Sequence, residues 1–475
     1  MDAATPQAAH GCAGCVALRE QVRQLQATVT QLQEQVCELQ ARLDQNSSNS
    51  HKPPSSDPPW AGKRPVTKKP SGRKPGGQIG HKGHYRRRLP PERIDEVIRH
   101  IPSHCEYCHA PLPKESRPGD PEPTWHQVAE LPLMAAVVTE HQGHARRCGC
   151  CGRITQEPIP PEVQQHVLGP RLSATMSYLS GRCHDGRRLV QEIVQDLFDV
   201  PIALGTVMAY EQEMSLALNQ PYEQALQTVR QARNKHVDET GWKQAGQTCW
   251  LWTCATAQAA VFAIQKGRNW KGLCDLLGSK RGGRGIIHSD RLHAYGPLGV
   301  ERRQICWAHL KRDFQKWLDR GPSTKLLGED GLALCHSLFA VWRDFRLGKM
   351  KWKTLKRKMA PLRRRLSQVL RWGVRCGEAK AAQFCRNLLK LQRAIWAFTR
   401  VPGLEPTNNH AERMLRPAVL WRKNSFGCHA PSGCRFVERM LTAVQTLRMQ
   451  GHGVLNWLHQ SLIAHRAGLP APKLV

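Results

Sequence analysis

An apolar residue recurs along the N-terminal segment at alternating intervals of four and three positions, and this pattern strongly limits how that segment can fold. The stripe consists of Leu18, Val22, Leu25, Val29, Leu32, Val36, Leu39 and Leu43. A stripe this narrow covers one side of a helix, and a second helix is needed to bury it. We predict a coiled coil over residues 16–45 through which the chain self-associates. The alternative is a single amphipathic helix that docks on its own chain.

The charge of the chain points to a polyanionic partner. Its 475 residues include 70 Lys and Arg against 38 Asp and Glu, a formal net charge of +32, and such a field favours nucleic acid. A basic ribosomal or membrane-associated protein is the alternative. We find neither a signal peptide nor an apolar run long enough to span a bilayer. The 18 cysteines are therefore expected to be reduced, in a cytoplasmic, nucleoid-associated protein without membrane contact.

Residues 46–95 are predicted to form a disordered linker. The segment opens with "QNSSNSHKPPSSDPPW" and continues as a basic run rich in Gly and Pro, which has almost nothing to bury. Within it Arg73, Lys74 and Lys82 are the expected contacts to the DNA backbone. A solubilising tether is the alternative for this segment.

Two cysteine pairs predict a structural zinc site within residues 96–160. Cys105 and Cys108 form one C-x-x-C pair, and Cys148 and Cys151 form the second. Two thiolate pairs on tight turns can complete a tetrahedral Zn²⁺ site. Cys150 is an alternative ligand to Cys148, and buried thiols without metal are the alternative for the whole set.

Residues 165–228 are predicted to be helical. The segment "GRRLVQEIVQDLFDVPIALGTVMAYEQEM" contains two helical patterns separated by a break at Asp199, Val200 and Pro201. Such a pair resembles a DNA-reading helix-turn-helix. An ordinary helical hairpin has the same pattern.

Two aspartates follow short β-rich runs in the next part of the chain. Asp238 follows His236 and Val237 in "KHVDETGW", and Asp290 ends the run "GIIHSD". Acids at strand ends beside loops are well placed to share a metal ion. Taken singly, each aspartate is also explained as a turn or cap residue.

Glu412 is the third acid of interest, and it lies in "PTNNHAERMLRPAVLWRKNSFG". This segment predicts a turn followed by a helix that Thr407 or Asn408 caps, with Glu412 in the first helical turn. The helix would present a carboxylate to a metal ion. A charged, solvated helix is the alternative.

The same helix carries cations that are candidates for DNA binding. Arg413 and Arg416 are three positions apart and therefore share one face, and Arg422 and Lys423 follow in the same segment. One helix could thus offer guanidinium groups to phosphate beside the carboxylate.

Cys306 and His309, in "CWAHLKRDF", have the spacing of half a metal site. A single half-site is a weak signal. The sequence favours a packing role for them where a strand passes into a helix.

Together, "VDETGW", "HSDRLHAYG", "CWAHLKRDF" and "TNNHAERMLRPAVLWRKNSFG" resemble the IS66 family of DDE transposases. The preceding order of heptad helix, "QNSSNSHKPPSSD", "RKPGGQIGHKG" and paired cysteines resembles it as well. The resemblance implies a multidomain α/β protein with an RNase H-like catalytic domain over residues 230–445. Residues 318–398 would be a helical insertion that braces the DNA, or alternatively an internal scaffold, and 446–475 a helical tail.

The resemblance also implies site residues and chemistry. Asp238, Asp290 and Glu412 match the three catalytic acids, which would hold Mg²⁺ or Mn²⁺ for cleavage and strand transfer of DNA. The implied partners are the terminal inverted repeats of an insertion sequence, target DNA and accessory proteins of the same element. The alternatives are a non-catalytic, zinc-containing DNA-binding regulator and an RNase H-like nuclease that does not join strands.

Overall fold

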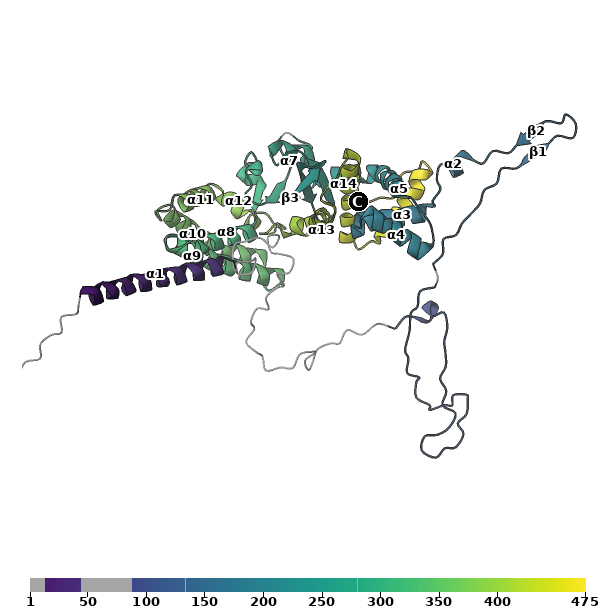
Figure 1. Ribbon diagram of the computed structural model, residues 1–475, viewed down its shortest axis with the longest axis horizontal. Helices are drawn as coiled ribbons and strands as arrows, with labels where there is room; N and C mark the ends of the chain where they lie inside the picture. Colours follow the sequence, from purple (N-terminus) through teal and green to yellow (C-terminus); the bar gives the residue numbers. More distant parts are fainter. Residues whose placement is uncertain (1–12, 44–87, 133, 280) are drawn as a thin grey trace, which may run out of the picture. The chain divides into compact units, whose positions relative to one another are not determined.

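The computed structural model describes residues 13–43, 88–132, 134–279 and 281–475 (Figure 1). Most of the predicted linker, including Arg73, Lys74 and Lys82, lies outside these residues. The heptad segment forms one helix, α1 (Ala13–Leu43). Its stripe is exposed in the single chain, from 47% at Val22 to 85% at Leu43.

The chain divides into two units. One contains residues 88–138, apart from residue 133, together with Leu197–Asp199; it includes the short helix η2 (Pro91–Arg93) and a turn that carries the cysteine pair Cys105 and Cys108. The other unit contains the second cysteine pair. There, strands β1 (Ala145–Arg147) and β2 (Ile154–Gln156) pair antiparallel on either side of Cys148 and Cys151.

A five-stranded mixed sheet forms the centre of the larger unit. Its order is β5-β4-β3-β6-β7, with β3 (Asn234–Gln244), β4 (Gln247–Ala255), β5 (Ala260–Gln265), β6 (Ile286–Ser289) and β7 (Arg303–Ile305). β3, β4 and β5 form an antiparallel meander, whereas β6 and β7 run parallel to β3. The predicted β-rich runs are therefore strands of a single sheet.

Helices that precede the strands in the sequence, lie between them or follow them enclose this sheet in one apolar core. They are α3 (Pro170–Tyr178), α5 (Leu204–Ala217), α6 (Asn219–Gln231), α7 (Trp270–Leu277), α13 (Asn409–Ser425), α14 (Pro431–Met449) and α15 (Val454–Arg466). Trp252 on β4 and Phe262 on β5 are completely buried. β4 is buried on both faces along most of its length, which is why its sequence is an almost continuous apolar run.

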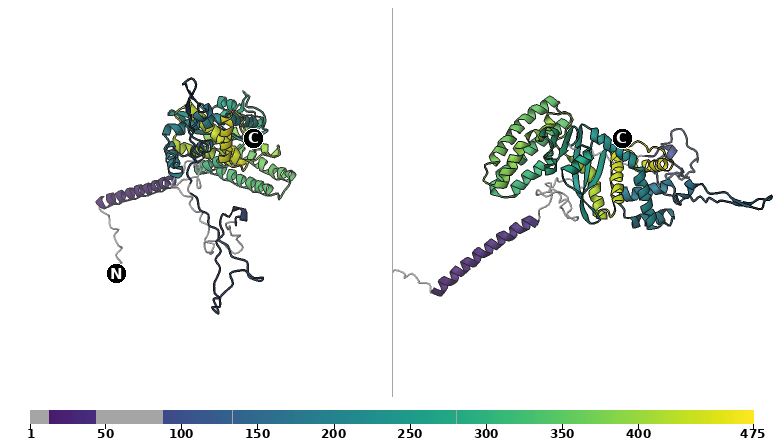
Figure 2. Two further views of the ribbon diagram at one scale, coloured as in Figure 1. Left: turned by 90° about the vertical axis from the view of Figure 1, so that its right-hand side faces the viewer. Right: turned by 90° about the horizontal axis from the view of Figure 1, so that it is seen from above.

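A second core is largely helical, with contributions from β7 and from Leu404 in a loop. It consists of α8 (Trp307–Asp319), α9 (Pro322–Arg346), α10 (Trp352–Gly373), α11 (Ala379–Lys390) and α12 (Gln392–Ile395). These green helices gather on one side of the sheet, and α14, α15 and α3 gather on the other (Figures 1 and 2). The helical core thus supports α8, which begins immediately beyond β7.

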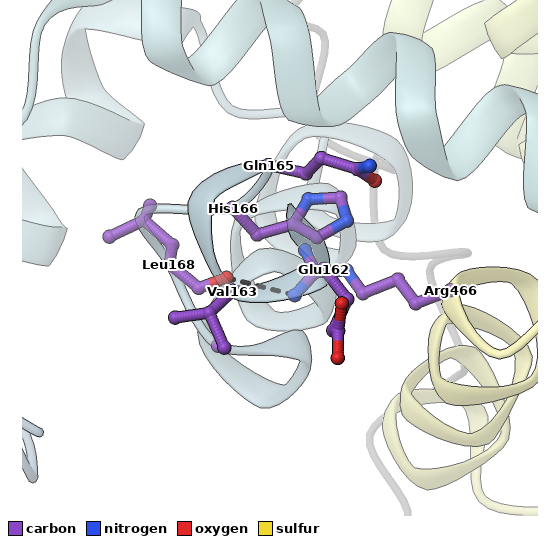
Figure 3. Close-up of a pocket in the computed structure, with 7 residues that line it drawn as sticks. Glu162, Val163, Gln165, His166, Leu168 and Arg466 are labelled. Carbon is purple, nitrogen blue, oxygen red and sulfur yellow. Dashed lines mark hydrogen bonds between the residues drawn. The ribbon is translucent and has the colours of Figure 1, made fainter. Parts of the chain in front are cut away.

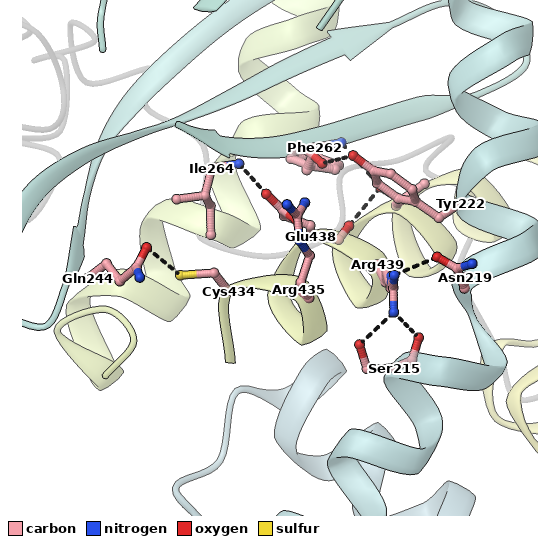
Figure 4. A network of polar contacts seen from close by, with 11 residues as sticks. Ser215, Asn219, Tyr222, Gln244, Phe262, Ile264, Cys434, Arg435, Glu438 and Arg439 are labelled. Carbon is pink, nitrogen blue, oxygen red and sulfur yellow. Dashed lines mark hydrogen bonds and ion pairs between the residues drawn. The ribbon is translucent and has the colours of Figure 1, made fainter. Parts of the chain in front are cut away.

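Helix α14 completes the hydrogen bonding of the sheet's edge. The N–H groups of Ala260, Phe262 and Ile264 on β5 donate to side-chain oxygens on α14 at 3.2, 3.2 and 2.6 Å. The acceptors are Thr446, Thr442 and Glu438, one helical turn apart. The spacing of alternate residues along β5 thereby matches the spacing of every fourth residue along α14. Figure 4 shows the Glu438 contact, and this arrangement leaves the edge strand no free donors for another chain.

Arg466 of the C-terminal helix α15 ties that helix to α5. Its guanidinium pairs with Glu213 of α5 at 2.8 Å and donates to the Leu168 carbonyl at 2.9 Å. Figure 3 shows Arg466 reaching from α15 into a pocket beside His166 and Leu168. Sequence positions almost 300 residues apart are therefore locked together by one side chain.

The predicted pair of helices before the sheet is present. α4 (Arg187–Phe198) ends where Asp199 takes a positive φ of 52°, and α5 follows. Within the described residues no helix combines the length and the apolar character that a membrane crossing demands.

We predict that Gly331→Ala destabilises the helical core. A Cβ at Gly331 of α9 would lie 2.1 Å from the buried ring of Phe314, which packs edge-on against Phe384. Overpacking of this kind costs about 1–3 kcal/mol, which exceeds the helix-propensity gain of up to about 1 kcal/mol. Thermal unfolding should therefore begin at a lower temperature.

The matched control is Gly205→Ala in α5, where an added Cβ meets nothing within 4 Å. That variant should be as stable as the parent or slightly more stable. Equal unfolding temperatures for the two variants would contradict the close packing of α9 on α8.

Candidate functional site

Asp238 and Asp290 come together because of the parallel pairing of β3 with β6. His236 on β3 is in register with His288 on β6, and the two imidazoles stack with centroids 4.0 Å apart. Each aspartate follows its histidine by two positions, so Asp238 shares the face of His236. Asp290 directly follows the last residue of β6.

The position of Asp238 differs from the strand end that the sequence suggests. It lies within β3, which continues to Gln244 because β4 pairs with it over that whole length. β6 is much shorter and stops at Ser289. Asp238 therefore lies beyond the point where the parallel neighbour β6 ends. There β3 is still paired with β4 on one edge but is no longer paired with β6 on the other.

Helix α13 begins over this same face and is held there by Asn408. The Asn408 side-chain amide donates to the Val237 carbonyl at 2.8 Å, and its Oδ1 lies 3.2 Å from His236 Nδ1. His410 Nε2 lies 2.8 Å from the Thr256 carbonyl oxygen at the end of β4. These contacts bring Glu412, in the first turn of α13, to the aspartates.

The three carboxylates form one electrostatic group. Burial raises the pKa of Asp238 well above its ordinary value, and the charges of Glu239, Glu412 and Asp290 raise it further. Burial also raises the pKa of Glu412; the charge of Asp290 adds to this, while Arg312 and Arg413 oppose it. In the described residues no Lys or Arg forms an ion pair with Asp238, Asp290 or Glu412.

Neighbouring acids are neutralised by arginine instead. Glu239 pairs with Arg268 at 2.7 Å and accepts a hydrogen bond from the Tyr295 hydroxyl at 2.9 Å. Asp313 pairs with Arg291 at 2.6 Å. The absence of such partners at the group of three marks it as a place where a cation would relieve repulsion.

Glu412 also belongs to a tight group with Cys306 and His309. One potential ligand atom of each residue lies within 4.8 Å of the others, and among the described residues this is the single group of three or more that is so compact. His309 Nδ1 is 3.6 Å from Glu412 Oε1. Burial, and then Arg312, lowers the pKa of His309 to about 4, so this contact is not an ion pair at neutral pH.

The cations of α13 differ in what they contact. Arg413, Arg416 and Lys423 are exposed. Arg422 instead donates through Nη1 to the Thr240 hydroxyl at 2.9 Å and to the Gly241 carbonyl at 2.6 Å. It thereby ties the end of α13 to β3.

Each cysteine pair lies on a turn that favours thiolate. Backbone N–H groups of Cys108 and Tyr107 lower the pKa of Cys105. N–H groups of Cys151 and Cys150 likewise lower the pKa of Cys148. The two pairs belong to different units of the chain.

Asn408 is the functional residue that the sequence reasoning assigned differently. It precedes α13 as predicted, but its side chain does not cap the helix. The side chain is buried and bonds to β3, whereas the neighbouring Asn409 is exposed. The adjacent asparagines in the sequence single out this position, but they do not show that Asn408 bonds to Val237 on β3.

We predict that Asn408→Ala lowers the thermal unfolding temperature, whereas Asn409→Ala does not. Loss of the Asn408 amide leaves the Val237 carbonyl without this donor, and such a loss costs about 1–3 kcal/mol. Asn409 is exposed and serves as the matched control. Indistinguishable unfolding temperatures would show that Asn408 does not hold α13 on the sheet.

We further predict that Asp238→Asn stabilises the metal-free protein near neutral pH. The folded-state pKa of Asp238 is raised, so folding opposes its ionisation. The wild type therefore loses stability as pH rises from the ordinary aspartate value, near 4, towards the raised one. Asparagine removes that loss, and the two proteins should converge at lower pH.

The measurement is thermal unfolding in chelator across this pH range. Asp275→Asn, at an exposed acid of α7 that pairs with Lys271, is the control. A wild type that is the more stable protein at neutral pH would contradict the electrostatic reasoning.

Comparison with known proteins bears on this whole region. Residues 168–435, more than half of the chain, match the family model described as Transposase IS66 family. Residues 9–87 match a model described as a family of unknown function. A protein of Sinorhizobium fredii (strain NBRC 101917 / NGR234), named uncharacterized protein y4qI, is 25% identical over 442 residues, covering 81% of this chain and 74% of that protein. The first match includes the sheet, the helical core and all three acids, and the chain belongs to the IS66 transposase family.

Proposed function

We propose that Asp238, Asp290 and Glu412 are the catalytic carboxylates of a DDE transposase that cleaves and joins DNA at the ends of an insertion sequence. The observation that carries this proposal is a group of three acids that, among the described residues, form no ion pair with Lys or Arg in a protein of net charge +32. The acids come from β3, from the end of β6 and from α13. A mixed sheet with one acid within β3, one just beyond the end of its parallel neighbour β6 and a third on a later helix supports an RNase H-like catalytic domain over residues 230–445.

The donor set suits Mg²⁺ or Mn²⁺. Hard divalent cations prefer carboxylate oxygens, and mutual repulsion between partly buried carboxylates is relieved when a cation binds. When bound, such ions would activate the attacking oxygen and stabilise the leaving oxygen of an in-line displacement. The acids of the chain would hold the ions, and the buried sheet beneath them would fix their positions.

DNA would be held by cations that remain free for it. Arg413 and Arg416 are exposed on the helix that carries Glu412, and Lys423 is exposed towards its other end. Phosphate contacts of this kind position the nucleic acid without reading its sequence. Arg422 contributes indirectly, because its guanidinium bonds to β3. The terminal inverted repeats and target DNA are the proposed partners.

The remaining parts of the chain would supply assembly and DNA recognition. The exposed stripe of α1 supports a coiled coil that pairs two copies of the chain. Cys105, Cys108, Cys148 and Cys151 are the proposed ligands of a structural Zn²⁺. The helices of residues 165–228 would contact the inverted repeats, and the helices of residues 318–398 would form an insertion that braces the DNA.

A strand-transfer assay tests the proposal. Purified protein is incubated with Mg²⁺ and labelled DNA that carries the element's ends, with the element's other products added in a parallel reaction. Wild type should nick and join the DNA. Asp238→Asn, Asp290→Asn and Glu412→Gln should each lower the rate at least about 100-fold, the upper range for losing even an outer-shell partner of a metal ligand.

Asp275→Asn is the matched control, since Asp275 is an exposed acid of the same unit, and it should retain the wild-type rate. Binding of the same DNA is measured for every variant to separate chemistry from affinity. Products that are cut but never joined would favour a nuclease. Equal activity of wild type and the Glu412 variant would refute the assignment of the third acid.

A further inference from the structure

The group formed by Cys306, His309 and Glu412 has the chemistry of a second kind of metal site. Cys306 directly precedes α8, and His309 lies in the first turn of that helix. Glu412 approaches from the first turn of α13. The three ligand atoms lie within 4.8 Å of one another, and they offer sulfur, nitrogen and oxygen rather than oxygen alone.

Two of these atoms are buried and have no hydrogen-bond partner in the part of the chain that the structure describes. They are His309 Nδ1 and Glu412 Oε1. Their separation of 3.6 Å is too long for a hydrogen bond. It is close to the edge of a tetrahedron around zinc, about 3.3–3.5 Å for Zn–N and Zn–O bonds of about 2.0–2.1 Å. A cation between the two atoms would satisfy both.

Cys306 can act as the third ligand by losing its proton when the cation binds. The Asn408 backbone N–H donates to Cys306 Sγ at 3.1 Å and Sγ lies at the N-terminus of α8, but burial raises the pKa of the thiol to about 11, so the cation must displace the proton. The Cys306 backbone N–H donates to the Ser289 carbonyl at 2.9 Å, which fixes the residue beside the end of β6. The site is therefore held by backbone contacts that do not depend on a metal ion.

We infer that Cys306 Sγ, His309 Nδ1 and Glu412 Oε1 bind a thiophilic divalent cation of the Zn²⁺ class, at a site that is distinct from the cysteine pairs and shares only Glu412 with the carboxylate site. Sulfur and imidazole ligands select zinc over magnesium. Three protein ligands leave a fourth position for water. In the metal-free protein Glu412 Oε1 already belongs to this group, so zinc binding would retain Glu412 there.

This consequence rests on the proposed catalytic role of Glu412. A carboxylate whose oxygen is bound to zinc beside Cys306 is less available to join Asp238 and Asp290. Zinc should therefore inhibit Mg²⁺-dependent strand transfer by competing for one acid. The binding site itself does not depend on that role.

Binding is tested first, in the full chain with Cys105, Cys108, Cys148 and Cys151 replaced by serine so that they do not contribute. Co²⁺ is the spectroscopic probe, because thiolate ligation produces a charge-transfer band, and Zn²⁺ stoichiometry is measured by equilibrium dialysis. We expect the band and one bound equivalent of zinc. Cys306→Ser should abolish the band, and His309→Ala and Glu412→Gln should weaken zinc binding about 10–100-fold or more.

Cys335→Ser is the matched control, because Cys335 is a completely buried thiol in α9 outside the group, and it should keep both signals. His309 is partly exposed, so its variant tests the site even if Cys306→Ser fails to fold. Unchanged zinc affinity in folded His309→Ala, or a Co²⁺ band that survives in folded Cys306→Ser, would overturn the inference.

Strand transfer then tests the competition for Glu412. Zinc should inhibit strand transfer by the chain that keeps Cys306. The Cys306→Ser variant should need at least about 10-fold more zinc for the same inhibition, matching its loss of zinc affinity. Equal inhibition of both proteins would refute the shared ligand. A chain that binds zinc as expected but never joins DNA would refute the proposed function and leave the metal site intact.

Discussion

The hydrogen bonds of Asn408 are the contact on which the arrangement of the site depends. Its side chain bonds to the Val237 carbonyl on β3, and its backbone N–H bonds to Cys306 at the start of α8. A buried amide without partners is costly, so these atoms admit few alternative positions. Three segments that are far apart in the sequence are thereby fixed at one point, and Glu412 follows one helical turn later.

Electrostatics then separates the acids of this region into two classes. Glu239 and Asp313 have arginine partners and are neutralised within the fold. Asp238, Asp290 and Glu412 lack such partners among the described residues, although the chain carries a large excess of Lys and Arg. A partly buried carboxylate that is repelled by its neighbours binds a cation more readily than one already paired. The fold therefore leaves these three acids without an arginine ion pair, although Arg312 and Arg413 lie close enough to lower the pKa of Glu412.

Glu412 connects this oxygen-rich group to one of different chemistry. On one side are two aspartates, which suit a hard cation, and on the other are a thiol and an imidazole, which suit a soft one. A single carboxylate between two such groups offers a simple means of control, because the ion that binds it decides which group is complete. The helical core that supports α8 and the sheet that supports Asp238 hold the two groups at a fixed spacing.

The sequence by itself determined the elements and the identity of the acids. The heptad stripe specified α1, the β-rich runs specified the strands, and "TNNHAERMLRP" specified a helix with Glu412 in its first turn, because side-chain periodicity and turn chemistry are local properties. Only the tertiary structure decided that Asp238 lies within a strand, that Arg422 bonds to β3, and that Cys306 and His309 meet Glu412. These outcomes depend on which strands pair and which buried polar atoms keep a partner. Both are fixed by packing between segments that are distant in the chain, and local sequence carries no record of it.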